Sequence, residues 1–345
     1  MLGNNYQGKD ELRSKTVTLY AEAVNVLFTL RGFHPPIDFS DPNNEGAQLI
    51  LNLAAQETIA NQREPLTNPI MAKLLEMARD SHPNSAIRAV ANVAAICRYL
   101  GCRVSEYAQK TQTKIDYHVY PSGLRVIKAF LLTDWVFFDE KGTRLSIAPF
   151  TNRPMSEIYD QIDHMSVTWR IQKNRQNGQS LKLKVDRANE PLCPIKNALE
   201  IVLRKLRIDR ARLATPLCVF TKEAHSTNAL YLTARKVAEV IQKAVKAVHP
   251  NISKKELSRY TAHSFRVWAA VLLDEQGKQP TFIKSRLRWM GDSFMLYLRD
   301  TMKMNELHRE ALSSESSAIV DLVTILNEGS TTDTASMGNY QDDMD

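Results

Sequence analysis

The periodicity of apolar residues changes in the middle of this sequence and then changes back, which limits the folds open to the chain. Up to about residue 100, and again after Pro191, apolar residues recur at three- and four-residue spacing, as in amphipathic helices. From residue 118 to residue 185 they form short runs rich in β-branched and aromatic residues, which are typical of strands. Asn177-Gly178 marks a turn between the last two runs. We predict a mainly α-helical protein with a small antiparallel β-sheet between its helices, an α+β fold.

The same patterns predict where the elements lie. We expect helices at residues 10–31, 45–62, 69–79, 84–100, 194–207, 229–248, 264–276, 280–288 and 304–327. Strand-like runs occupy residues 126–139, 143–150, 164–173 and 180–185. The helical pattern breaks near residues 63–68, where we place a domain boundary. The expected parts are a short N-terminal helical arm at 1–64, a main domain at 65–328 and a disordered acidic tail at 329–345.

Composition excludes several classes of protein. The chain has 345 residues, of which 43% are hydrophobic and 24% charged, so disorder throughout, a collagen repeat and a disulfide scaffold are excluded. No apolar run approaches the roughly 20 residues of a membrane helix, and residues 1–15 lack the apolar core of a secretory signal. The four cysteines form no CxxC pair, which favours reduced thiols in an intracellular protein over a zinc site.

The distribution of charge favours a polyanionic partner. Residues 1–65 carry a net charge of −3 and residues 329–345 of −4, so residues 66–328 carry +14, against +7 for the whole chain. A basic domain of this kind is typical of proteins that bind nucleic acid. A solvated basic surface with no such partner is the alternative that charge alone leaves open.

Short motifs of common enzyme classes are missing from the sequence. It contains no Walker A loop, GxGxxG, HExxH, GxSxG or EF-hand loop. The residues that remain for chemistry are cations and proton-transferring groups in four separate segments.

The first two segments each supply one cation. In GCRVSEY, Arg103 follows a helix-ending glycine and can point into a cleft, or it can pair with Glu106 on the next turn. In IQKNRQNGQ, Lys173 enters the hairpin turn and can reach into a groove, or it can be a solvated turn residue.

The last two segments combine cationic and aromatic residues. In TAHSFRVW, His263 and Arg266 share one helical face near a helix N-terminus, where both can contact one phosphate. The alternative is a capping histidine with an exposed arginine. In LRWMGDSFMLY, Trp289 follows a helix and Tyr297 lies on the next short helix, although both could be core residues.

The four segments together resemble one family. Their order resembles the catalytic set of the tyrosine recombinases, or phage-integrase family, whose relatives include type IB topoisomerases. GCRVSE resembles the family's first-arginine motif, HSFR its His-x-x-Arg box, and RWMGDSFMLY its Trp/His-to-Tyr segment. The resemblance covers about residues 65–328, and the wording of REPLT, SEYAQ and RLRWMGDSF is closest to integrase-like proteins of eukaryotic mobile elements.

This chain departs from the family's pattern at three points. Arg103 and His263 are separated by 160 residues, which we interpret as an elaborated sheet around residues 119–165. Gly291-Asp292 stands where a glycine-histidine pair is common, so the penultimate catalytic role would pass to Trp289. The N-terminal region is short for a DNA-gripping arm, and we expect a reduced core-binding-like region or a fragment of a longer polyprotein.

The resemblance implies a tyrosine-recombinase-type catalytic domain that cleaves and rejoins DNA through a 3′-phosphotyrosine intermediate, in recombination or DNA integration. Two arginines would clamp the phosphate, a histidine would act as base, a lysine as acid, a tryptophan would pack, and a tyrosine would attack. The implied catalytic residues are Arg103, Lys173, His263, Arg266, Trp289 and Tyr297. The resemblance implies no metal and no small-molecule cofactor.

Double-stranded DNA is the implied partner. A basic stretch is expected to follow the phosphate backbone with Arg170, Lys173, Arg175, Lys182, Lys184 and Arg187. The helix at 304–327 would either dock on a neighbouring protomer, in a tetramer on DNA, or fold back on its own domain. No membrane association is expected, and a eukaryotic source would imply a nuclear protein.

Three other functions stay open on the sequence. The chain could be a recombinase-derived DNA-binding protein without activity, or a topoisomerase-like enzyme that nicks and rejoins DNA without exchanging partners. It could also be a basic helical scaffold unrelated to DNA, which predicts no cleft that gathers the candidate residues.

Overall fold

The computed structural model describes residues 14–56, 63–146, 150, 153–172, 177–298, 306, 309 and 310. The chain forms two compact units, Met1–Gln62 and Arg63–Asp345.

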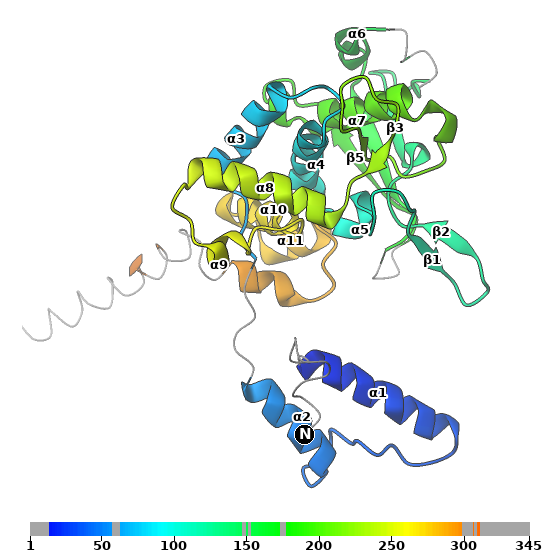
Figure 1. The fold of residues 1–345 in the computed structure, drawn as a ribbon, viewed down its shortest axis with the longest axis vertical. Coiled ribbons are helices and arrows are strands. Elements are labelled where there is room, and N and C mark those ends of the chain that lie inside the picture. The colour runs from blue at the N-terminus through cyan, green and yellow to red at the C-terminus, as the bar shows by residue number, and fades with distance from the viewer. Residues whose placement is uncertain are drawn as a thin grey trace, which may run out of the picture. The chain divides into compact units, whose positions relative to one another are not determined.

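The N-terminal unit is a pair of helices, α1 (Ser14–Leu30) and α2 (Glu45–Gln56), drawn in blue in Figure 1. Asn25 secures the connector between them, because its side chain donates to the Ile37 carbonyl (2.6 Å) and accepts from the Ile37 N–H (3.1 Å). Among the described residues of this unit, the buried apolar side chains are Ala21, Ala47 and Ile50. Many larger apolar side chains on α1 are exposed.

The second unit contains most of the described helices. They are α3 (Asn68–Arg79), α4 (Ala86–Leu100), α5 (Val104–Tyr107), α6 (Met155–Asp160), α7 (Pro194–Ile208), α8 (Ala234–Val248), α9 (Lys254–Leu257), α10 (Ser264–Glu275) and α11 (Pro280–Arg286). Short 3₁₀ helices are η1 (Leu132–Asp134), η3 (Glu190–Leu192), η4 (Arg210–Arg212) and η5 (Asp292–Tyr297).

Helix α4 is the central element of this unit. Every residue from Ala89 to Cys97 is buried, because small side chains let neighbouring helices approach on all sides. It packs against α3, α7, α8 and α10, as Figure 1 shows. Ser85 caps its N-terminus by accepting from the Arg88 N–H, and Gly101 ends it in the left-handed conformation. Helix α4 therefore ends directly before the segment that contains Arg103.

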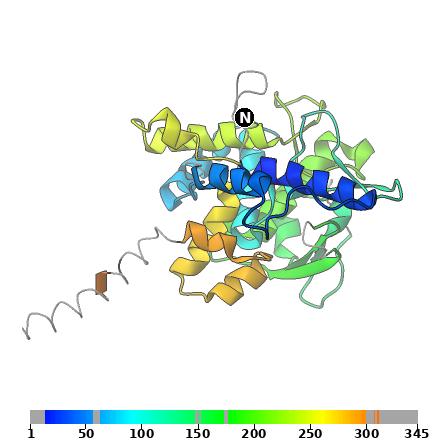
Figure 2. The same cartoon turned by 90° about the horizontal axis from the view of Figure 1, so that it is seen from below.

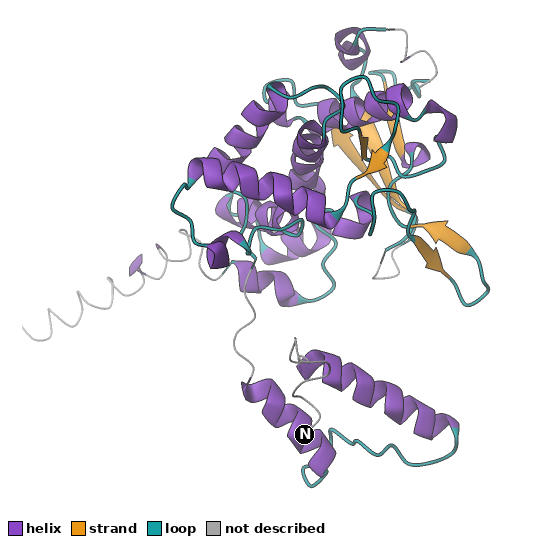
Figure 3. Ribbon diagram, in the orientation of Figure 1, coloured by secondary structure: helices purple, strands orange, loops and turns teal. Residues whose placement is uncertain are grey.

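Among the residues that the structure describes, three small antiparallel sheets complete the unit (Figure 3). The largest has the order β3-β4-β5, from Trp135–Phe138, His164–Trp169 and Gln179–Lys184. Alternate residues of β4 are buried, so one face of this sheet packs on the helices. Strands β1 (Tyr117–Val119) and β2 (Arg125–Ile127) form a hairpin that projects from the unit, and β6 (Val219–Phe220) pairs with β7 (Leu230–Tyr231).

The predicted fold class is confirmed, since the described residues are mainly helical with small antiparallel sheets. The helices predicted at 69–79, 84–100, 194–207, 264–276 and 280–288 match α3, α4, α7, α10 and α11 to within two residues. The helices predicted at 10–31 and 45–62 agree with α1 and α2 over their described parts. The tail at 329–345 and all but Glu306, Arg309 and Glu310 of the helix predicted at 304–327 lie outside the described residues.

Three predictions of elements need correction. The helix predicted from residue 229 begins at Ala234, because Leu230 and Tyr231 pair with β6 and Thr233 caps the helix by accepting from the Lys236 N–H. The run at 143–150 forms only a single bridge between Arg144 and Phe138 in its described residues, after a tight turn. The run at 126–139 is divided into β2 and β3 by η1.

No helix among the described residues is long and apolar enough to cross a membrane. The cysteines Cys97, Cys102, Cys193 and Cys218 are all buried and free.

Candidate active site

Arg103 is positioned by the end of helix α4. Gly101 adopts a φ of +52°, and a Cβ atom there would lie 2.9 Å from Leu287 Cδ2, so the glycine permits both the turn and the close approach of the Leu287 segment. Arg103 then caps the short helix α5, and the Glu106 carboxylate accepts from its backbone N–H at 3.0 Å. Its guanidinium lies 3.5 Å from Glu106 Oε1 and donates to Gln172 Oε1 at 3.5 Å. The predicted alternative of an Arg103–Glu106 pair is therefore present, but with a buried carboxylate.

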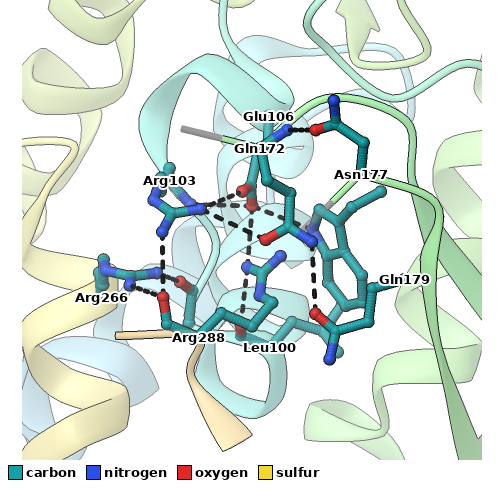
Figure 4. Close-up of polar contacts among 10 residues, drawn as sticks. Leu100, Arg103, Glu106, Gln172, Asn177, Gln179, Arg266 and Arg288 are labelled. Carbon is teal, nitrogen blue, oxygen red and sulfur yellow. Dashed lines mark hydrogen bonds and ion pairs between the residues drawn. The ribbon is translucent and has the colours of Figure 1, made fainter. Parts of the chain in front are cut away.

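Arg266 and Arg103 share one backbone acceptor. Arg103 donates to the Arg288 carbonyl at 3.0 Å, and Arg266 donates to the same oxygen at 3.4 Å. Arg266, on helix α10, also donates to the Gly101 carbonyl and is 3% exposed. Three segments that lie far apart in the sequence thus hold two guanidinium groups side by side, as Figure 4 shows.

Arg288, whose carbonyl accepts from both arginines, was not among the residues predicted from the sequence. It has a φ of +58°, which is costly for a residue with a side chain. Its buried guanidinium lies over the Trp169 ring at 3.8 Å and donates to Glu106 Oε2 at 3.1 Å. Trp169 Nε1 donates to the same carboxylate oxygen at 3.2 Å. We call these buried contacts among Glu106, Trp169 and Arg288 the bracket. The bracket holds in place the segment whose Arg288 carbonyl accepts from both arginines.

The sequence held only a partial signal for this bracket. The spacing of Arg103 and Glu106 indicated an ion pair, but nothing in the pattern showed that Glu106 would be buried against Trp169 and Arg288. Pairs so distant in the chain become visible only after folding.

Tyr297 and His263 meet at the opposite side of the same site. The Tyr297 hydroxyl lies 3.4 Å from His263 Nε2, and the ring centroids are 6.0 Å apart. His263 occupies the N-cap position of helix α10, and the Tyr107 hydroxyl holds the preceding turn by donating to the Ala262 carbonyl at 2.8 Å. Tyr297 ends the 3₁₀ helix η5, which is anchored on α10 through the buried Phe294.

Trp289 packs within the site. The Arg266 guanidinium lies over its ring at 4.2 Å from the centroid. Its indole nitrogen is buried with no hydrogen-bond partner among the described residues. The ring also lies 6.4 Å from that of Tyr297, so Trp289 lines the cavity next to both Arg266 and Tyr297.

These side chains surround one cavity of about 890 Å³. Five of the six predicted catalytic residues line it, and its walls are Arg103, Val104, Ser105, His263, Arg266, Trp289, Met290, Gly291, Ser293 and Tyr297. The alternative of a basic helical scaffold predicts no cleft that gathers the candidate residues, whereas five of them line this cavity. Lys173, the sixth, lies outside the described residues.

The electrostatics of the cavity favour an anion. Burial and the neighbouring Arg103 lower the pKa of Arg266 to about 9, and burial also lowers the pKa of Arg103. Burial, with Arg266 and Arg63 close by, lowers the pKa of His263, which keeps the imidazole neutral at pH 7. A bound phosphate would stabilise both guanidinium ions, and a neutral imidazole can accept a proton.

The predicted phosphate-contacting residues are only partly described. Lys173 and Arg175 lie outside the described residues. Lys182 and Lys184 are exposed on one face of β5, although Lys184 Nζ lies 3.8 Å from Asp163 Oδ1.

The two remaining residues of that set also make contacts within the protein. Arg170 donates to Asp134 Oδ1 at 2.6 Å and to the Ala129 carbonyl at 2.6 Å. Arg187 donates to the Ile162 carbonyl at 3.2 Å and is half-exposed. Their role on DNA stays a prediction.

The described residues contain no group of three or more histidine, cysteine, aspartate or glutamate side chains that could hold a metal ion. The positive charge in the described cavity comes from arginine.

Comparisons with known proteins give distant structural similarity only. No protein-family model matches the sequence, and no curated protein matches it. Solved structures of tyrosine recombinases and integrases resemble it over most of the chain. The Tn1549 transposon integrase in complex with circular intermediate DNA is 13% identical with a TM-score of 0.40, covering 86% of this chain and 79% of that chain.

Two further structures resemble the chain to a similar degree. XerA recombinase is 13% identical with a TM-score of 0.38, covering 88% of this chain and 85% of that chain. A lambda integrase dimer bound to a COC′ core site is 13% identical with a TM-score of 0.36, covering 86% and 84%. Similarity this low says nothing about the activity of this chain.

Proposed function

We propose that this chain cleaves and rejoins DNA strands through a 3′-phosphotyrosine intermediate, as a tyrosine recombinase. The observation that carries the proposal is one cavity in which two arginines share a backbone acceptor and face a hydrogen-bonded Tyr297–His263 pair. A structural role for each residue alone would not bring all of them around one cavity.

The two arginines suit a phosphodiester. Arg103 and Arg266 can each donate to a non-bridging oxygen, which a planar guanidinium does well. Each charge contact is worth roughly 4 kcal/mol at 4 Å and an effective dielectric near 20, before desolvation. Only the part that strengthens in the transition state accelerates cleavage. The Arg288 carbonyl holds both guanidinium groups in position before the reaction. The two groups therefore need no reorganisation as charge develops in the transition state.

The Tyr297 hydroxyl is the nucleophile in this proposal. Its oxygen forms a bond to phosphorus, the phosphorus–5′-oxygen bond breaks, and the phenolic proton passes to His263 Nε2. The departing 5′-oxygen takes a proton, for which Lys173 is the proposed donor. A new 5′-hydroxyl then attacks the phosphotyrosine and gives its proton to Lys173, while the bond between phosphorus and the Tyr297 oxygen breaks and His263 returns its proton to Tyr297. The bond energy is conserved, so rejoining needs no nucleotide triphosphate.

The partners follow from this chemistry. Double-stranded DNA is the proposed substrate, and exchange between two sites requires several protomers, for which a tetramer is the proposed assembly. DNA recombination or integration is the proposed process, and it would take place in the nucleus if the source of the chain is eukaryotic. A topoisomerase-like enzyme would use the same Tyr297 without partner exchange.

Covalent trapping tests the proposal. The full chain is incubated with negatively supercoiled DNA and a pool of nicked duplexes, with and without a chelator, and quenched in detergent. We expect a detergent-stable protein–DNA adduct whose phosphopeptide contains Tyr297. Tyr297→Phe should abolish the adduct, whereas Tyr260→Phe, a change of the same kind outside the cavity, should preserve it.

The contrary outcomes are equally defined. An adduct that survives Tyr297→Phe would place the nucleophile elsewhere. DNA binding without any adduct on the whole pool would favour a recombinase-derived binding protein.

A further inference from the structure

A second cavity adjoins the first at Arg103. It has a volume of about 550 Å³, and Arg103 and Ser105 line both cavities. The hairpin β1–β2 supplies one wall, and the start of α5 with the two ends of the β4–β5 turn supplies the others. Its lining residues are Arg103, Ser105, Glu106, His118, Tyr120, Lys128, Ile171, Gln172 and Asn177.

The hairpin presents one of its two faces to this cavity. His118 and Tyr120 are two residues apart and therefore on the same face of the strand, with ring centroids 4.5 Å apart. His118 lies opposite Val126, so Lys128, two residues further along, is on that face too. Tyr117 is on the other face, where Arg125 lies over its ring at 4.4 Å.

The cavity joins three kinds of group that recognise a nucleotide. His118 and Tyr120 are half-buried aromatic rings with faces on which a base can stack. Lys128 and Arg103 can contact phosphate oxygens. Asn177 is exposed at the rim, and its Oδ1 accepts from the Gln172 N–H at 2.6 Å, which orients the amide. Amide groups at this position can bond to the edge of a base.

We propose that this cavity binds one unpaired DNA nucleotide next to the phosphate held by Arg103. The inference rests on the proposed function, since it takes Arg103 as a phosphate contact. Arg103 lines both cavities, so a DNA strand whose phosphate contacts Arg103 can place the neighbouring nucleotide in the second cavity. The volume lies within the roughly 300–1,000 Å³ of pockets that hold small ligands.

An unpaired nucleotide fits better than a paired one. A base within a duplex has neighbours on both faces and a partner at its edge, so aromatic side chains can stack on it only after it leaves the helix. The hairpin therefore recognises a strand that is locally opened beside the cleaved bond.

The test measures non-covalent binding by the full chain carrying Tyr297→Phe, which prevents attack on the DNA. The probes are a fluorescein-labelled oligothymidylate and a fluorescein-labelled GC-rich DNA hairpin whose stem is long enough to stay paired at the assay temperature, and binding is followed by fluorescence anisotropy at low salt. Tyr120→Ala should weaken binding of the single strand about 5- to 100-fold, the range expected for one base–aromatic stack. Binding of the duplex should change less than twofold.

Matched variants separate recognition from folding. Tyr117→Ala removes the same side chain from the opposite face of the same strand, and it should leave both affinities unchanged. Tyr120→Phe keeps the ring and should bind the single strand like the parent chain. Lys128→Gln should lower the slope of log affinity against log salt by about 0.7 for the single strand.

Two outcomes overturn the inference: Tyr120→Ala binds the single strand normally, or Tyr117→Ala weakens it equally. The proposed function fails separately. Trapping without adduct, together with Tyr120-dependent binding of the single strand, would leave a nucleotide site on a protein that does not cleave DNA. An adduct at Tyr297 together with normal binding by Tyr120→Ala would remove only the nucleotide site.

Discussion

The arginine side and the tyrosine side of the cavity are held in different ways. Arg266 is buried, lies over the Trp289 ring, and donates to two backbone carbonyls, one of which Arg103 also uses. Tyr297 is half-buried, and its described polar contact is the 3.4 Å approach to His263. The arginine side is thus built into the core of the unit, whereas the tyrosine side ends a short 3₁₀ helix.

This difference suits the proposed division of labour. Fixed cations stabilise developing charge best when nothing has to move during the reaction. A nucleophile must approach phosphorus, become bonded to it and return, so a less enclosed position serves it. Substitutions on the two sides should therefore have different effects. On the arginine side they should lower both the stability of the protein and the rate of adduct formation, whereas on the tyrosine side they should lower the rate alone.

Among substitutions that keep the proposed nucleophile, the largest effect is expected from His263→Gln. Without the base, formation of the Tyr297 adduct should slow about 10²- to 10⁴-fold at pH 7. Burial, with Arg266 and Arg63 nearby, holds the pKa of His263 below 6.5. The parent rate should therefore fall as pH drops through that pKa, because protonation removes the acceptor. The rate of the His263→Gln variant should not show this fall at low pH, which is measured as the rate of adduct formation between pH 5 and 8. An unchanged profile would exclude His263 as the base.

A somewhat smaller effect is expected from Arg266→Lys. The charge is kept, but an ammonium group cannot reach the phosphate, Gly101 and Arg288 with one planar fork. The rate should fall about 10²- to 10³-fold, the cost of removing one preorganised donor. Thermal unfolding should also shift downward, since buried carbonyls lose their donors. A full rate with lysine would mean that charge alone suffices.

The smallest effect is expected from Arg288→Met, which tests the bracket behind the arginines. Glu106 would lose its contact to Arg288 and keep Trp169 Nε1 and the Arg103 N–H. The free energy of unfolding should drop by about 1–3 kcal/mol, as for a hydrogen bond to a buried charge. Denaturant unfolding measures the drop, and adduct formation should change less than it does for Arg266→Lys. A rate loss larger than that would place the Arg288 side chain in the chemistry itself.

The site could be predicted from the sequence only where local pattern carries the information. The spacing of His263 and Arg266 on one helix, and the breaks at Gly101 and Gly291, were readable because helical geometry acts over three or four residues. The bracket of Glu106, Trp169 and Arg288 was not, since it joins α5, β4 and the end of α11. The β1–β2 hairpin cavity was missed for the same reason: its walls come from three parts of the chain.

The sequence by itself determined the α+β fold class, most helices of the second unit and the set of residue types on which the proposed phosphoryl transfer depends, because periodicity and composition act locally. Tertiary structure alone decided that Arg103 and Arg266 donate to one carbonyl, that Tyr297 meets His263, and that a second cavity opens beside Arg103. Packing around α4 brings those segments together, and a contact between distant residues exists only once the core between them has formed.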